Sequence, residues 1–163
     1  MTSPTPPPPE ATGLATRHLK RGPALALTAV TAVLLTACTA TPAEDLESWW
    51  GSGGRTHIRT VSDDAKRVSE LVRRSRERGA LDSTAAALPA CKDLRTHVAA
   101  AEAYDPIPDK DAQSFWSSAL GSFRKGASDC IAGSFMGVME IETEGSSNLQ
   151  VTVSTIRRIM VGP

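Results

Sequence analysis

The sequence has few aromatic residues and no excess of charge. Phe, Trp and Tyr make up 4% of the 163 residues, and 18 lysines and arginines balance 18 aspartates and glutamates. Because phosphate backbones are bound through a dominant basic surface, this balance argues against a nucleic-acid partner. A chain that is poor in aromatics and rich in alanine forms packed helices more readily than sheets. The composition therefore favours an all-α domain.

The common catalytic signatures are also missing. The chain contains no GxSxG, no HExxH, no phosphate loop and no dinucleotide fingerprint. Asp93 and His97 have the i, i+4 spacing of one helix face, which would let the carboxylate orient the imidazole as a general base. No nucleophile with a local signature accompanies them, so we interpret the two as an exposed pair on a helix. We expect a non-enzymatic protein with no catalytic residue, no metal site and no cofactor.

A secretory signal is predicted near the N-terminus. Basic residues in the segment 17–21 precede an apolar run from Pro23 to Leu35, which is followed by Thr36-Ala37-Cys38. Small residues before Cys38 are typical of a cleavage site, and the pattern resembles the lipobox of bacterial lipoproteins. That resemblance implies that the Cys38 thiol carries diacylglycerol. A plain cleaved signal or a retained membrane helix is the alternative, although residues 23–37 are fewer than the about 20 that span a bilayer.

These features divide the chain into three segments. We assign residues 1–37 to a signal peptide with a proline-rich cytoplasmic start, residues 38–54 to a lipid-anchored tether and residues 55–161 to a helical domain. Two acyl chains attach a protein stably to a membrane, whereas one chain binds only marginally. We therefore expect the mature protein on the outer face of the cytoplasmic membrane, attached through diacylglyceryl Cys38.

Cys91 and Cys130 are the cysteines left once Cys38 is assigned to the lipid. An even pair in an exported chain is most simply a disulfide. Metal binding is the alternative, but no second CxxC or HxxxH accompanies the pair. We predict a disulfide between Cys91 and Cys130.

Three segments carry apolar residues at helical spacing. We predict helices over Arg55–Arg78, from about Asp82 to Tyr104 and from about Asp109 to Ala132. Pro89 is tolerated only in a first turn, so the second helix is expected to begin near Ala86. The predicted fold is a small helical bundle of three to four helices with one disulfide.

The segment 134–163 fits two periodicities. With period two, apolar residues alternate around Gly145-Ser146-Ser147-Asn148, as in a β-hairpin, which would make the fold α+β. With period 3.6, one face carries Phe135, Val138, Ile141, Leu149, Ile156 and Ile159. Three helices need a fourth surface to cover their core, so we favour a helix, with Gly145 where two helices approach closely.

Two features suggest surface contacts. The side of the first predicted helix opposite its apolar stripe carries Arg67, Arg74 and Arg78, which would meet anionic lipid headgroups or wall polymers. Such a face is more often only solvated. Trp49 and Trp50 lie close to the predicted anchor and would suit a membrane interface. We favour the alternative that they cap the base of the core.

Residues 49–133 resemble a family of small actinobacterial cell-surface lipoproteins of no assigned activity. The resemblance rests on the order and spacing of short motifs: Trp49-Trp50 with Gly53-Gly54, Ala90-Cys91 with Leu94, Pro106-Ile107-Pro108-Asp109, Trp116 with Ala119-Leu120, and Asp129-Cys130 with Gly133. It implies a helical domain in which the two cysteines are paired, and it supplies no catalytic residues.

Our first functional hypothesis is therefore a non-enzymatic interaction module, displayed outside the cell to an unknown envelope protein or polymer. The alternative is a carrier or sensor that holds a small apolar ligand in the bundle core, near Trp116 and Phe123. An unfilled interior cavity would favour the carrier, and a close-packed interior would not.

Overall fold

The structure is a computed structural model that describes residues 40–79 and 84–162. All of these residues belong to one compact unit, Cys38–Pro163, which is distinct from a second unit, Met1–Ala37. The predicted signal peptide and the lipidation site Cys38 lie outside the described residues.

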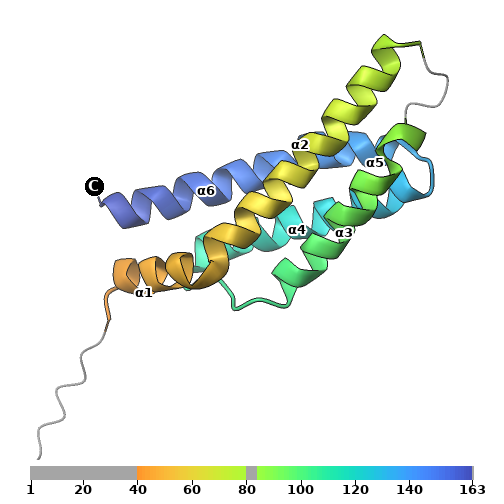
Figure 1. Cartoon of the computed structure of the whole chain (residues 1–163). Coiled ribbons are helices and arrows are strands. Elements are labelled where there is room, and N and C mark those ends of the chain that lie inside the picture. The colour runs from red at the N-terminus through yellow and green to blue at the C-terminus, as the bar shows by residue number, and fades with distance from the viewer. Residues whose placement is uncertain (1–39, 80–83, 163) are drawn as a thin grey trace, which may run out of the picture. The chain divides into compact units, whose positions relative to one another are not determined.

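The described residues are helical and contain no strand. The α-helices are α1 (Pro42–Trp49), α2 (Arg55–Glu77), α3 (Leu88–Glu102), α4 (Lys110–Ile131), α5 (Phe135–Glu140) and α6 (Ser146–Val161) (Figure 1). A π-helical turn joins α1 to α2 (Trp50–Gly54) and another joins α5 to α6 (Ile141–Gly145), and a short 3-10 turn (Ala85–Ala87) leads into α3. The prediction of a small all-α bundle is confirmed.

Local sequence explains where several helices begin. The Thr41 hydroxyl accepts a hydrogen bond from the Glu44 N–H, and the Glu44 carboxylate accepts one from the Thr41 N–H. This capping box satisfies two backbone N–H groups at the start of α1. Asp109 caps α4 by accepting a hydrogen bond from the Ala112 N–H at 2.8 Å. Pro89 lies in the first turn of α3, where its missing N–H costs no hydrogen bond.

The chain from Phe135 to Val161 is helical throughout, so the β-hairpin alternative is wrong. We call α5, the π-turn and α6 together the C-terminal arm. The period of 3.6 predicts its buried face: Val138, Ile141 and Ile156 are fully buried and Leu149 is 6% exposed. These side chains turn toward α4, which supplies the apolar surface that a solvent-exposed hairpin would lack.

The folded part begins earlier than the predicted boundary at residue 55. The segment predicted as a tether, residues 38–54, is helical from Pro42 onward, with Leu46 fully buried and Trp49 nearly so. The Trp49 indole N–H donates to the Asp105 carbonyl at 2.7 Å, and this bond ties α1 to the α3–α4 connection. The tether prediction is therefore wrong for these residues, because two apolar side chains in a helix this short leave little periodicity to detect.

The prediction that tryptophan caps the base of the core is confirmed for Trp49.

Helix α4 lies at the centre of the packing. It contacts α3 on one side and α5, the second π-turn and α6 on the other, whereas α2 packs mainly on α3 (Figure 1). Its buried side chains form the middle of the core: Ala112, Trp116, Ala119, Leu120, Phe123, Ala127 and Cys130.

A disulfide joins α3 to α4, as the two cysteines predict. Cys91 and Cys130 are bonded, with their Cα atoms 6.3 Å apart and a sequence separation of 39. On the chain-entropy model, closing a loop of this length stabilises the fold by about 4 kcal/mol. Both sulfurs are buried in the core, so the bond also fixes the level at which the two helices meet.

Glycines let the C-terminal arm approach α4 closely. A Cβ added at Gly126 of α4 would lie 2.7 Å from both the Gly137 carbonyl oxygen and Ile141 Cγ1, and one at Gly137 would lie 2.5 Å from the Gly126 oxygen. A Cβ at Gly145 would lie 2.5 Å from the Phe123 ring, which confirms the predicted close approach there. Since backbone atoms meet at Gly126 and Gly137, no side-chain rotation can make room for a larger residue.

We expect Gly126→Ala to lower the free energy of unfolding by about 1–3 kcal/mol, because overpacking at the helix contact outweighs the helix propensity gained. Gly121→Ala on the same helix is the matched control, since a Cβ there meets nothing within 4 Å. That control should be neutral or stabilising by up to about 1 kcal/mol, as expected for Gly→Ala within a helix. Urea unfolding of both variants measures the difference, and equal values would contradict the close-approach argument.

Candidate functional site

A groove runs between α2 and the C-terminal arm. We call it the α2 groove, with residues 62–77 of α2 forming one wall and residues 135–157 of the arm forming the other. It consists of a larger hollow of about 730 Å³ and a smaller hollow of about 540 Å³. The two hollows adjoin, because Ala65, Lys66 and Ser146 line both.

The groove exists because its two walls are held by different neighbours. Helix α2 rests mainly on α3, whereas the C-terminal arm rests on α4. The two walls touch only lightly, where α2 runs obliquely across the arm (Figure 1). The apolar residues between them are consequently not fully covered by the protein's own helices.

The floor of the groove is apolar. It is formed partly by core side chains that expose a small part of their surface to the hollows, namely Ala65, Val72 and Leu149. Met139 also lines the larger hollow and is 36% exposed. Phe135 closes one end, with the Arg76 guanidinium 4.5 Å from its ring centroid. This stacking holds a cation at the rim by a cation–π interaction.

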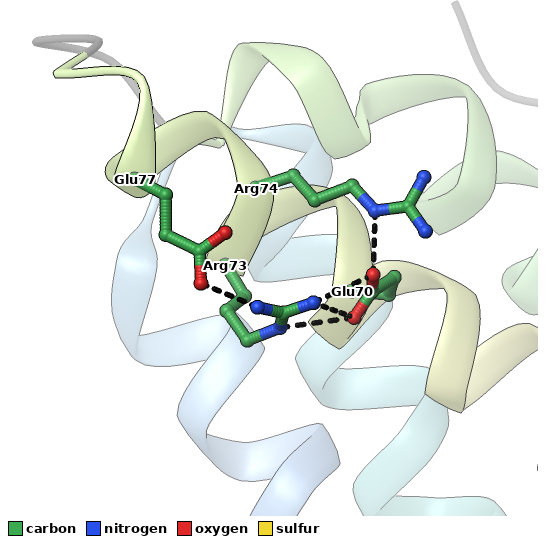
Figure 2. Close-up of polar contacts among 4 residues, drawn as sticks. All are labelled: Glu70, Arg73, Arg74 and Glu77. Carbon is green, nitrogen blue, oxygen red and sulfur yellow. Dashed lines mark hydrogen bonds and ion pairs between the residues drawn. The ribbon is translucent and has the colours of Figure 1, made fainter.

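Four charged residues of α2 form a network (Figure 2), and three of them, Glu70, Arg73 and Glu77, line the larger hollow. The Glu70 carboxylate accepts from Arg73 Nε at 3.0 Å and from Arg74 Nε at 2.5 Å, and Arg73 also binds Glu77. The Arg73 bonds, and then those of Arg74, hold the pKa of Glu70 below its ordinary value. The same Glu70 bonds raise the pKa of Arg73. All four side chains are solvent-exposed, so the network sets local charge more than it stabilises the fold.

The three arginines predicted as an anionic-surface contact have different surroundings. Arg74 is bound to Glu70, and Arg67 lies 3.8 Å from Asp93 of α3. Arg78 follows α2 directly as its C-cap residue. Two of the three charges are thus balanced by nearby carboxylates, and the predicted contact with anionic surfaces stays a prediction.

The histidine that the sequence pairs with Asp93 has a different partner. His97 Nδ1 lies 2.5 Å from Asp64 Oδ2, so the contact joins α3 to α2 rather than two residues of one helix. The predicted His97–Asp93 pair is therefore wrong, because spacing along one helix does not reveal the neighbour on another. Within residues 40–79 and 84–162, no three potential metal ligands converge.

Sequence reasoning missed a polar and aromatic cluster at the π-turn after α1. The Tyr104 ring centroid lies 4.6 Å from that of His57, and the Tyr104 hydroxyl is 2.9 Å from Ser52 Oγ. A Cβ at Gly53, whose φ is +150°, would lie 2.9 Å from this hydroxyl. No periodicity links positions this far apart in sequence, so only the fold reveals the cluster.

The core position suggested for an apolar ligand is filled. Phe123 is fully buried with its ring against Gly145, and Trp116 is 3% exposed. A small hollow of about 260 Å³ reaches the edge of Trp116 from the α3–α4 connection, and its lining, which includes Glu102 and Gln113, is more polar than apolar. The larger apolar space lies at the surface, in the α2 groove.

Comparison with protein families, with curated proteins and with solved structures finds no match to this chain. Among the described residues, no helix combines the length and the apolar character needed to cross a membrane.

We expect the Glu70 carboxyl to titrate below the ordinary glutamate value of 4.5 and Arg73→Gln to raise its pKa, because the Arg73 bonds are the largest cause of the shift. Because its pKa is lower in the folded state, Glu70 stabilises the folded protein at a pH above the ordinary glutamate pKa. This contribution is lost as the pH falls through the folded-state pKa. Carbon-detected NMR titration of the Glu70 carboxyl measures the midpoint. Arg78→Gln removes the same charge from the same helix as a control, and an unchanged midpoint in Arg73→Gln would refute the assignment.

Proposed function

We propose that the protein is a lipid-anchored extracytoplasmic lipoprotein that acts as a non-enzymatic binding module, with the α2 groove as its binding surface. The observation that carries the proposal is the groove itself. An apolar floor with charged rims, left open on a bundle whose interior is filled, has the composition of a surface that binds a partner.

The location is inferred from the N-terminal sequence. The basic segment, the apolar run and Cys38 have the order of a lipoprotein signal, and the motif resemblance points to small actinobacterial cell-surface lipoproteins. The Cys91–Cys130 disulfide supports this location, because disulfides persist in oxidising compartments and are rare in the cytosol.

A small apolar ligand is the second candidate for the same surface. The floor of the groove would suit it, whereas the interior around Phe123 has no room for it. Small-molecule sites bury about 70–90% of the ligand. The groove is open along its length, which favours a larger partner.

Lipidation can be tested at Cys38. We expect Cys38→Ala to lose labelling by palmitate and to leave the membrane fraction, or to accumulate as the unprocessed precursor, because no thiol remains to be acylated. Fractionation of a bacterial host that processes lipoproteins measures both effects. Wild-type levels of labelling and membrane retention in the variant would refute the lipid assignment.

The binding surface can be tested by photo-crosslinking on intact cells. A photoreactive phenylalanine analogue at Met139, in the groove, should give a discrete adduct, whereas the same analogue at Phe115 of α4 should not. The two positions are matched, with exposed fractions of 36% and 37%, and Phe115 lies outside the groove. Adducts of equal intensity at both positions, or at neither, would refute the groove as the binding surface.

A further inference from the structure

We infer that the α2 groove receives an amphipathic helix of a partner protein, with acidic side chains of that helix facing Lys66 and Arg157. This inference rests on the proposed function, since it names the class of partner for the same groove. It is carried by the charge of the smaller hollow and by the arrangement of the groove walls.

The smaller hollow is positively charged. Among the described residues that line it, Lys66 on α2 and Arg157 on α6 are the only charged ones, and they stand on opposite walls. Lys66 Nζ lies 3.8 Å from the Asp63 carboxylate, and the same carboxylate lies 3.7 Å from Arg59. One carboxylate shared by two cations leaves an excess of positive charge, which a partner's carboxylates would complement.

The larger hollow has no such excess. Its rim carries both signs, and the carboxylates of Glu70 and Glu77 are already bound to Arg73. Glu142 on the opposite wall adds a further negative charge. The smaller hollow is therefore cationic and the larger one carries mixed charge, which places the partner's acidic residues over the smaller hollow, between Lys66 and Arg157.

Each wall of the groove is a single helical stripe. The lining residues of α2 recur every three or four positions from Ser62 to Glu77. The lining residues of the arm recur at the same spacing from Phe135 to Arg157. At 1.5 Å per residue, the α2 wall is about 22 Å long, which matches a helix of about four turns. Apolar side chains at i, i+3, i+4 and i+7 of such a helix would cover the floor in the helix-in-groove mode.

The direct test uses a covalently stapled helical peptide of about 16 residues, because an unconstrained helix of this length is marginal in water. It carries Leu at the apolar positions and Glu beside them at one end, and a control peptide has Lys in place of each Glu. The protein is the compact unit Cys38–Pro163 with Cys38→Ser, which contains every described residue. We expect the Glu peptide to bind about ten-fold more tightly at low salt and to shift the amide signals of Ala65, Leu149 and Val153.

Charge reversal on the protein should reverse the preference. The double variant Lys66→Glu/Arg157→Glu should bind the Glu peptide about ten-fold more weakly and the Lys peptide more tightly than the unmodified protein does. Lys92→Glu/Arg158→Glu is the matched control, since both residues are exposed, carry the same charges and lie outside the groove. Thermal unfolding of both variants separates a loss of binding from a loss of folding.

Three outcomes would overturn the inference. Equal binding of the two peptides, or amide shifts outside the groove, would rule out an acidic amphipathic helix as the occupant of the groove. Displacement of the peptide by decanoate with the same amide shifts would identify a small anionic amphiphile as the occupant. A dimer that the double variant abolishes, seen by light scattering, would identify a second copy of the chain. In each case the proposed function is tested separately, by photo-crosslinking at Met139 and by membrane fractionation of Cys38→Ala.

Discussion

The arrangement depends on the contact between the backbones of α4 and the C-terminal arm. Gly126 and Gly137 bring carbonyl oxygens and Cα atoms to a distance that no Cβ would allow. The arm is thereby held against α4 and buries Val138 and Ile141. The arm covers one side of α4 and disulfide-bonded α3 covers another. Helix α2 consequently packs on α3, and its side toward the arm is left partly uncovered as the groove.

The early start of α1 changes the geometry of the proposed anchor. The predicted tether of residues 38–54 shortens to the residues before Pro42, since α1 begins there. A chain spans at most about 3.5 Å per residue, so lipidation at Cys38 would hold the start of α1 within about 14 Å of the bilayer. Under the proposed function, the folded domain would therefore lie directly beside the membrane surface.

The helices were predictable where their apolar residues repeat over several turns. The stripes of α2, α3 and α4 are each long enough for the period of 3.6 to be distinguished from the period of two. The C-terminal arm fits both periods, and it was predicted as a helix because three helices need a fourth surface to cover their core. Helix α1 was not predictable in this way, because Leu46 and Trp49 are its only buried residues and two residues do not define a period. The disulfide followed from cysteine count and predicted export. The groove depends on how α2 crosses the arm, which no local pattern records.

Charges on a helix were predictable, but the charge available to a partner was not. The sequence points to Arg67, Arg74 and Arg78, yet Arg74 is bound by Glu70 of the same helix and Arg67 is close to Asp93 of the next. A carboxylate beside an arginine cancels part of its charge, so the attraction of that arginine for a partner's anion is reduced. Lys66 and Arg157 share no stripe, and only the packing of α6 beside α2 brings them to one hollow. Cations that the fold gathers from two helices, with one shared carboxylate nearby, therefore offer a stronger site for an acidic partner than a longer basic stripe that neutralises itself.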